Sequence, residues 1–294
     1  MLPREIVRQI RRLQLKARRA VEDLLGGEYH SVFKGMGMAF EEVREYQPGD
    51  DIRTIDWNVT ARMGHPFIKR YIEERELTVI LLVDWSGSHQ FGSGRQQKRE
   101  VAAELAAVLA FSAISNNDKV GLIGFTDQVE CFVPPRKGTR HVLRLIRDAL
   151  YYQPKHRKTS IRAGLQFLNR IQHRRAIVFL LTDFLDSGFE PMLKRTARRH
   201  DVLAIHIGDP REKEMPIAGL LEVVDAETGQ QLLVDGRSRR TRAHFSELAA
   251  SRREALQRLA RSARIDLLEV GTDGGHLDAL VQFFRQRERR LKSP

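Results

Sequence analysis

Two aspartates of this 294-residue chain each follow an apolar stretch, and each stands where it could help to hold a metal ion. Residues 79–83 lead into Asp84, and residues 176–181 lead through Thr182 into Asp183. Apolar runs of this length are typical of buried strands, and a parallel sheet binds its ligands beyond the carboxyl ends of its strands. We therefore expect the two carboxylates to face one crevice.

Hydroxyl groups stand next to the first of these aspartates. Ser86 and Ser88 alternate with Trp85 and Gly87 in the sequence DWSGS, so that the carboxylate and both hydroxyls can point at one centre. An all-oxygen ligand set without cysteine suits a hard cation, which favours Mg²⁺ or Mn²⁺ over zinc. The alternative is a turn whose aspartate and serines merely cap a helix, a common role of these residue types.

Apolar runs alternate with amphipathic segments from Thr78 onward. This alternation predicts that residues 78–294 form a three-layer, Rossmann-like α/β domain with a mostly parallel sheet and helices on both faces. The expected strands cover residues 79–83, 120–125, 176–181, 202–207 and 265–270, with residues 129–133 as an antiparallel edge strand. The expected helices cover residues 97–115, 138–151, 160–173, 188–199, 240–263 and 275–287. Residues 220–235 look like a hairpin insertion that turns at Glu227, Thr228 and Gly229.

Residues 1–77 follow a different pattern and are expected to form a separate N-terminal part. Residues 4–25 carry apolar side chains at helical spacing and basic side chains largely off that stripe, which predicts a basic amphipathic helix. Such a helix packs on the protein or on a partner, or makes peripheral contact with a membrane. Residues 28–77 predict a small β-containing subdomain, in which the charged residues from Asp50 to Arg62 are interpreted as a structural network rather than an active site.

The sequence DWSGS at the end of an expected strand resembles the DxSxS metal-ion-dependent adhesion site (MIDAS) of von Willebrand factor A domains. That site also takes a threonine and a second aspartate, whose counterparts here are Thr159 and Asp183. The resemblance implies Ser86 and Ser88 as direct ligands, Thr159 as a direct or water-mediated one, and both aspartates as largely water-mediated ones. One coordination position stays open, and in the family a carboxylate of the bound partner fills it.

Some neighbours of these residues are candidates for supporting roles. Thr182 and Asp186 flank the second aspartate and could hold the ligands in place, although turn or capping residues would look the same. Thr159 could itself be the N-cap of the helix expected at residues 160–173. His89 follows the second serine and could stand at the mouth of the site or merely face solvent.

A longer resemblance covers most of the chain, from about residue 29 to residue 287. It rests on five motifs in order, namely EVREYQPGDDIRTIDWNVTARMGHPFIKRYIEERELTV, LLVDWSGS, FVPPRKGTRHVLRLIR, LLTDFLDS and ARRHDVLAIHIGDP. These are similar to the bacterial family of domains of unknown function numbered fifty-eight (DUF58). Members are often encoded beside MoxR-type AAA+ ATPases, which implies a role in ATPase-driven assembly, maturation or remodelling of other proteins. Many members have an apolar residue where His89 stands.

The net charge of +12 favours acidic partners. Lys155, Arg157, Lys158 and Arg162 surround Thr159 in sequence and could form a basic rim that draws an acidic ligand, or could simply be solvated. The single cysteine fits a reducing compartment, and we recognise no signal peptide or membrane span, so a cytoplasmic location is expected. Specific nucleic-acid recognition is not expected, because no helix-turn-helix, zinc finger or aromatic-interleaved strand is evident.

The expected function is metal-dependent protein binding. The ligand would be an acidic protein that supplies a carboxylate to the metal, with a MoxR-type AAA+ ATPase as the expected partner. Catalysis is not expected, because both carboxylates are needed as ligands and sequence position ties no general base to the site. The alternatives are a phosphatase-like hydrolase whose ion activates water or a phosphoryl group, and a nonspecific binder of nucleic acid or anionic membrane.

Overall fold

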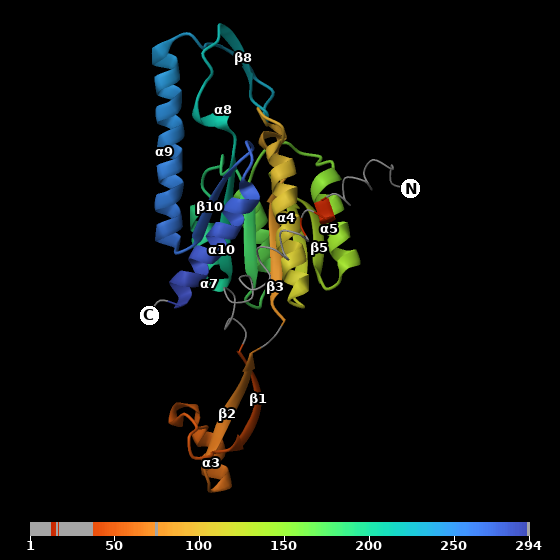
Figure 1. Ribbon diagram of the computed structural model, residues 1–294, viewed down its shortest axis with the longest axis vertical. Helices are drawn as coiled ribbons and strands as arrows, with labels where there is room; N and C mark the ends of the chain where they lie inside the picture. Colours follow the sequence, from red (N-terminus) through yellow and green to blue (C-terminus); the bar gives the residue numbers. More distant parts are fainter. Residues whose placement is uncertain (1–12, 16, 18–37, 74–75, 293–294) are drawn as a thin grey trace. The chain divides into compact units, whose positions relative to one another are not determined.

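The computed structural model describes residues 13–15, 17, 38–73 and 76–292 (Figure 1). The chain divides into two compact units, one of residues Phe33–Leu77 and a larger one that includes Thr78–Pro294. Residues 13–15 and 17 are helical, with Leu13 and Ala17 buried, and the rest of the expected N-terminal helix lies outside the described residues. No helix in the described part of the chain combines the length and apolar character that a bilayer crossing requires.

The larger unit is built on a six-stranded sheet in which only one edge strand, β5, runs antiparallel to its neighbour. In spatial order the strands are β10 (Asp266–Gly271), β7 (Asp201–Gly208), β6 (Ile177–Thr182), β3 (Thr78–Asp84), β4 (Lys119–Phe125) and β5 (Val129–Arg136). The chain places β4 on one side of β3 and β6 on the other, so the strand order reverses next to β3. The predicted fold class is confirmed.

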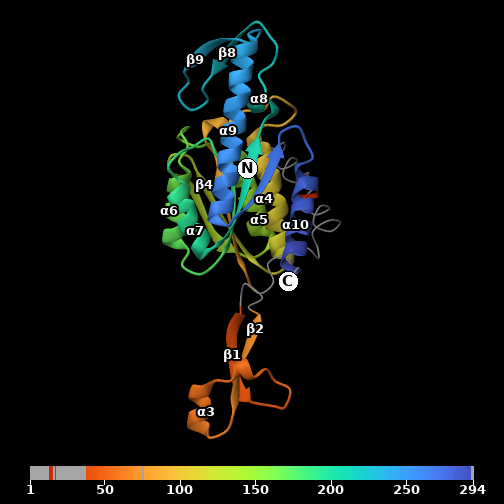
Figure 2. The ribbon, with the colours of Figure 1, turned by 90° about the vertical axis from the view of Figure 1, so that its left-hand side faces the viewer.

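Helices cover both faces of this sheet, as Figure 2 shows. One layer holds α6 (Ile161–Ile171), α7 (Glu190–Arg199) and α9 (Arg239–Ala263), and the other holds α4 (Lys98–Ser115), α5 (Thr139–Tyr151) and α10 (His276–Lys292). Two short helices, η3 (Gly87–Gln90) and α8 (Pro210–Lys213), follow β3 and β7. Strands β8 (Leu220–Val224) and β9 (Gln231–Asp235) pair as an antiparallel hairpin between α8 and α9.

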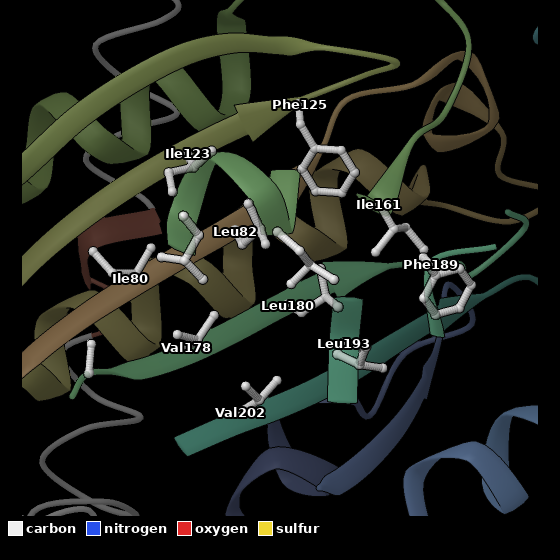
Figure 3. Packing of buried hydrophobic residues seen from close by; sticks show 13 residues of the cluster. Ile80, Leu82, Ile123, Phe125, Ile161, Val178, Leu180, Phe189, Leu193 and Val202 are labelled. Atoms are coloured by element: carbon white, nitrogen blue, oxygen red, sulfur yellow. The ribbon is translucent and has the colours of Figure 1, made fainter. Parts of the chain in front are cut away.

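The central strands are buried on both faces, which explains why their sequences are continuous apolar runs. Figure 3 shows one side of this core, where Leu82 of β3 and Leu180 of β6 meet Ile161 of α6 and Leu193 of α7. Each of these four side chains is fully buried, and burial of one such side chain contributes roughly 1.5–3 kcal/mol. The apolar core therefore holds the ends of β3 and β6 side by side.

The smaller unit pairs β1 (Met38–Glu45) with β2 (Phe67–Glu73) and carries η2 (Ile52–Thr54) and α3 (Trp57–Met63) between them. Its acidic residues serve local structure. Asp50 accepts two hydrogen bonds from the Arg44 guanidinium, at 2.8 and 2.9 Å, and Asp56 caps the first turn of α3. Trp57 lies mostly exposed at the start of α3. These contacts agree with a structural interpretation of the charged residues in this segment.

The histidine at the end of α7 makes the stability of the larger unit sensitive to acid. His200 is buried, and neither of its ring nitrogens has a hydrogen-bond partner among the described residues. Burial, helped by Arg199 and Arg175, lowers the pKa of His200 from 6.5 to about 4. Between these two pH values the unfolded chain takes up a proton that the native protein does not accept. Stability is therefore lost as the pH falls through this window, by up to about 1.4 kcal/mol per pH unit.

We predict that His200→Gln flattens this acid dependence, because glutamine does not titrate. The measurement is the free energy of urea unfolding at several values between pH 7 and pH 4.5. His173→Gln, which changes an exposed histidine in the same unit, is the control and should keep the slope of the unchanged protein. Equal slopes in all three proteins would contradict the assignment of the proton uptake to His200.

Candidate metal centre

The two carboxylates come together at the point where the strand order of the sheet reverses. Asp84 ends β3 and Asp183 directly follows β6, and the two strands pair in parallel up to Val83 and Leu181. The fractional exposure is 0% for Asp84 and 3% for Asp183. Potential ligand atoms of Asp84, Asp183 and His89 all lie within 4.8 Å of one another. The structure thus brings both predicted aspartates into one cluster that could hold a metal ion.

The loop after β3 turns its hydroxyls toward each other. Asp84 Oδ1 accepts a hydrogen bond from the Ser86 backbone N–H (2.9 Å), and Asp84 Oδ2 accepts one from the Thr182 hydroxyl (2.6 Å). The hydroxyl oxygens of Ser86 and Ser88 lie 3.0 Å apart. Ser86 occupies the N-cap position of η3, yet its side chain makes no capping hydrogen bond. Helix capping therefore does not account for these two hydroxyls.

The intervening residues of this loop fix its path. Trp85 is buried and stacks on Tyr152 with ring centroids 4.6 Å apart. The backbone N–H of Gly87 donates to the carbonyl of Arg157 at 2.7 Å. A Cβ atom on Gly87 would lie only 2.2 Å from the carbonyl oxygen of Ala226, which belongs to the turn between β8 and β9. Only glycine leaves room for that turn to sit on the loop.

Thr159 does not cap the helix that follows it. Ser160 is the N-cap of α6, which leaves the Thr159 hydroxyl free to donate a hydrogen bond to the carboxylate of Glu227 in the β8–β9 turn. Asp186 accepts a hydrogen bond from the Ile161 backbone N–H at 2.8 Å and so ties the loop after β6 to the start of α6. Thr182 and Asp186 both make contacts that support the positions of their neighbours.

The structure differs from expectation for His89. We considered it a candidate for the rim, but its side chain is fully buried and its Nε2 lies 3.6 Å from Asp84 Oδ2. Residues three apart eclipse in a 3₁₀ turn, and the His89 N–H donates to the Ser86 carbonyl, so the turn folds the ring back into the site. Neither ring nitrogen makes a hydrogen bond within the described part of the chain. His89 thus offers a nitrogen ligand.

A buried lysine that the sequence did not point to completes the cluster. Lys98, in the first turn of α4, is fully buried and donates to Asp183 Oδ2 at 2.9 Å and also to the Glu212 carboxylate of α8. Glu212 accepts a further hydrogen bond from the Asp209 backbone N–H as half of a capping box. The only sequence signal for this arrangement is that capping box, the residues DPRE after the apolar run 202–207.

Burial and nearby charges shift the pKa values of the two aspartates in opposite directions. Burial raises the pKa of Asp84, and the negative charge of Asp183 raises it further. Burial would also raise the pKa of Asp183, but the charge and hydrogen bond of Lys98, together with His89 and the Ser88 hydroxyl, outweigh burial and hold that pKa well below its usual range. Burial raises the pKa of Glu227, and Asp84 and Asp183 add to the shift against the hydrogen bonds of Thr159. Three carboxylates therefore share one electrostatic environment.

The donor set fits a divalent cation. It combines carboxylate oxygens, two hydroxyls that face each other and an imidazole whose nitrogens make no hydrogen bond among the described residues. Carboxylate and hydroxyl oxygens favour Mg²⁺ or Mn²⁺, and an imidazole nitrogen suits transition metals. The four rim residues, Lys155, Arg157, Lys158 and Arg162, are exposed on either side of Thr159 in the chain. Their positive charge is thus available to an approaching ligand.

Comparison with known proteins shows the family of this chain. The family model described as "Protein of unknown function DUF58" matches residues 42–255. The chain belongs to this family. The uncharacterized protein Rv1480 of Mycobacterium tuberculosis (strain ATCC 25618 / H37Rv) is 32% identical over 285 residues, which cover 95% of this chain and 89% of that protein.

Two solved structures match parts of this DUF58 chain. The conserved hypothetical protein BatB from Bacteroides thetaiotaomicron matches with 18% identity and a TM-score of 0.47 over 72% of this chain and 99% of that chain. Proximal thread matrix protein 1 from the mussel byssus, with a zinc-occupied MIDAS motif, matches with 18% identity and a TM-score of 0.35 over 45% and 38% of the two chains. The expected family and the expected α/β fold with a mostly parallel sheet are confirmed.

We predict that Lys98→Met destabilises the protein by about 3–5 kcal/mol in the presence of a chelator, because it leaves two partly or fully buried carboxylates without their cation. A divalent ion bound beside Asp183 would replace part of the missing charge, so added Mn²⁺ should stabilise Lys98→Met more than the unchanged protein. Urea unfolding with chelator and with Mn²⁺ measures both effects.

Lys194→Met, at an exposed position of α7, is the matched control. It should change the free energy of unfolding by less than about 0.5 kcal/mol and leave the response to Mn²⁺ unaltered. If Lys98→Met unfolds like this control in chelator, the buried ammonium does not compensate the two carboxylates.

Proposed function

We propose that this DUF58 protein is a metal-dependent protein-binding module, whose ion sits beyond the ends of β3 and β6 and grips a carboxylate of a partner protein. The observation that carries the proposal is the pair of facing hydroxyls, Ser86 and Ser88, beside two buried carboxylates. Neither hydroxyl is used for helix capping, and both belong to the loop that directly follows Asp84. A cation is the simplest ligand for such a set of donors.

The ligands predicted from the sequence and two supporting residues, Thr182 and Lys98, have distinct parts in this proposal. As the resemblance implies, Ser86 and Ser88 would hold the ion directly, Thr159 directly or through water, and Asp84 and Asp183 largely through water. A bound Mg²⁺ or Mn²⁺ supplies a Lewis-acidic position for an incoming carboxylate. The Thr182 hydroxyl orients Asp84 (2.6 Å), and Lys98 orients Asp183 (2.9 Å).

The proposed partner is an acidic protein. The exposed Lys155, Arg157, Lys158 and Arg162 would attract acidic groups around the one that reaches the metal. The family resemblance suggests a MoxR-type AAA+ ATPase as the partner, with a role in the assembly, maturation or remodelling of other proteins. Binding rather than catalysis is proposed, because the buried lysine is not available as a base. Burial alone would lower the pKa of Lys98, but Asp183 and Glu212 outweigh burial and raise it, so the amine stays protonated.

We predict that Mn²⁺ and Mg²⁺ bind with modest affinity, since few ligands are direct and one position awaits the partner. Asp84→Asn keeps the shape of the side chain and removes its charge, and it should weaken Mn²⁺ binding by about tenfold or more. Isothermal titration calorimetry measures the affinity. Asp127→Asn, which neutralises an exposed aspartate, should bind as the unchanged protein does. Equal affinity in Asp84→Asn, or no binding of millimolar ion by the unchanged protein, would exclude this site.

We predict that Ser86→Ala and Ser88→Ala abolish capture of the MoxR-type ATPase encoded by the same genome, without unfolding the protein. Charge reversal of Arg157 and Lys158 should instead slow association and weaken its salt dependence, because rim charges act mainly on the encounter of the two proteins. Surface-binding kinetics with Mg²⁺ and with chelator separate the two effects.

Arg195→Glu, an exposed reversal on α7, is the control for the rim variants and should leave association nearly unchanged. Capture that survives both the chelator and Ser86→Ala would show that no metal bridge exists. Binding would then rest on the basic surface alone, and the nonspecific alternative would replace this proposal.

A further inference from the structure

The turn between β8 and β9 brings a carboxylate of the chain itself to the candidate metal centre. Glu227 accepts the hydrogen bond of the Thr159 hydroxyl, and the neighbouring Ala226 carbonyl lies against Gly87 in the loop between the two serines. In both ribbon views the hairpin lies beyond the end of the sheet at which β3 ends (Figures 1 and 2). Thus two of the predicted ligand segments, the DWSGS loop and the segment with Thr159, are in contact with this turn.

The turn holds Glu227 in a defined orientation. The Asp225 carboxylate accepts hydrogen bonds from the backbone N–H groups of Glu227 (2.9 Å) and Thr228 (3.3 Å) and from the Thr228 hydroxyl (2.7 Å). Gly229 adopts a φ of 73°, which favours glycine, and its N–H donates to the Asp225 carbonyl at 2.8 Å. Glu227 is half-buried, whereas the other residues from Asp225 to Gln230 are exposed. The turn is therefore built to direct one acidic side chain inward.

The rest of the hairpin is weakly attached. In β8 and β9 only the cross-strand pair Leu221 and Val234 is partly buried, while Leu220, Leu232 and Leu233 are 75%, 65% and 69% exposed. A two-stranded hairpin is only marginally stable by itself. Contacts at its tip therefore decide whether the hairpin stays on the site or moves away from it.

We propose that Glu227 is an in-chain ligand of the bound metal, and that it fills the coordination position which a partner carboxylate takes when the hairpin is displaced. This inference rests on the proposed function, because it needs the ion. The Glu227 carboxylate contacts the Thr159 hydroxyl and feels the charges of Asp84 and Asp183, and among the described residues no lysine, arginine or histidine forms an ion pair with it. The proposal adds regulation to the site, since partner and hairpin then exclude each other.

Competition of this kind selects for particular partners. An in-chain carboxylate competes at an effective concentration of the order of millimolar, so a lone external carboxylate binds poorly. A partner that also contacts the basic rim gains enough affinity to displace Glu227. The hairpin would thus exclude small carboxylic acids and favour extended acidic surfaces.

Glu227→Gln tests the inference, because glutamine keeps the size of the side chain and a hydrogen-bond acceptor for Thr159 but loses the charge. Glu222→Gln, at an exposed position of β8 in the same hairpin, is the matched control. With Mn²⁺ alone as the probe, calorimetry should show affinity reduced by about tenfold in Glu227→Gln and unchanged in Glu222→Gln.

Hydrogen exchange gives a readout independent of affinity. Saturating Mn²⁺ should slow exchange of the amides of β8 and β9 in the unchanged protein and in Glu222→Gln, but not in Glu227→Gln. Gly87→Ala, whose added Cβ would collide with the Ala226 carbonyl, should also lose this protection. With acetate as the second probe, the Mn²⁺-saturated Glu227→Gln should bind acetate at least about tenfold more tightly than the unchanged protein, because the competing carboxylate is gone.

The outcomes separate this inference from the proposed function. If the unchanged protein binds Mn²⁺ and Ser86→Ala does not, but Glu227→Gln matches Glu222→Gln in Mn²⁺ affinity, hairpin protection and acetate binding, the in-chain ligand is refuted and the metal module stands. If the unchanged protein binds no Mn²⁺, both fail. Weaker Mn²⁺ binding, lost protection and tighter acetate binding in Glu227→Gln together support the in-chain ligand.

Discussion

Negative charge buried at the ends of β3 and β6 is the constraint on which the rest of this site depends. Two carboxylates without exposure to water repel each other, and each loses its hydration, so compensating positive charge or hydrogen-bond donors must be supplied nearby. Lys98 supplies one ammonium to Asp183, and the Thr182 hydroxyl and the Ser86 N–H supply donors to Asp84. Asp84 lacks a lysine or arginine partner among the described residues, and this is where a cation has most to contribute.

The sheet explains why the charge is placed there at all. Strands β3 and β6 are apolar along their length and covered by helices on both faces, so the polar side chains of these two strands stand at their ends. The strand order reverses next to β3, which is the position at which sheets of this kind bind their ligands. Loops from β3, β6 and the start of α6 then converge, with Gly87 allowing the closest approach. The apolar middle of the sheet thus stabilises the core, whereas the ends of its strands carry the candidate site.

Sequence patterns predicted the parts of this arrangement that depend on local periodicity. The apolar runs predicted most strand boundaries to within about two residues. The positions of Asp84 and Asp183 after two of these runs predicted that the two residues are neighbours. Thr159 became a candidate through its resemblance to the MIDAS threonine, and Thr182 and Asp186 became candidates because they flank Asp183 in the sequence. The family and the fold class followed from the same motifs.

Residues that depend on tertiary contacts could not be found in this way. Lys98 looked like an ordinary polar residue at the start of a helix. Its burial follows from the packing of α4 on the sheet, which places its ammonium between Asp183 and Glu212 of α8. His89 turns inward because a 3₁₀ turn, not an extended loop, follows Ser86. Glu227 was predicted as part of a turn, but no pattern in one sequence says that this turn contacts Gly87 and Thr159, which lie far from it in the chain.

The pairing of β8 with β9 has a consequence for how this site can diverge. Leu221 pairs with Val234, and from that pair outward each strand contributes a fixed rise per residue toward the turn that carries Glu227. Loss of two consecutive residues from each strand would draw the tip back by about 7 Å. Most surface insertions vary freely in length. Here the length of the hairpin decides whether its acidic tip reaches the metal site or leaves that site open. Proteins with the same DxSxS loop could therefore differ in the accessibility of the site through a deletion that lies far from this loop in sequence.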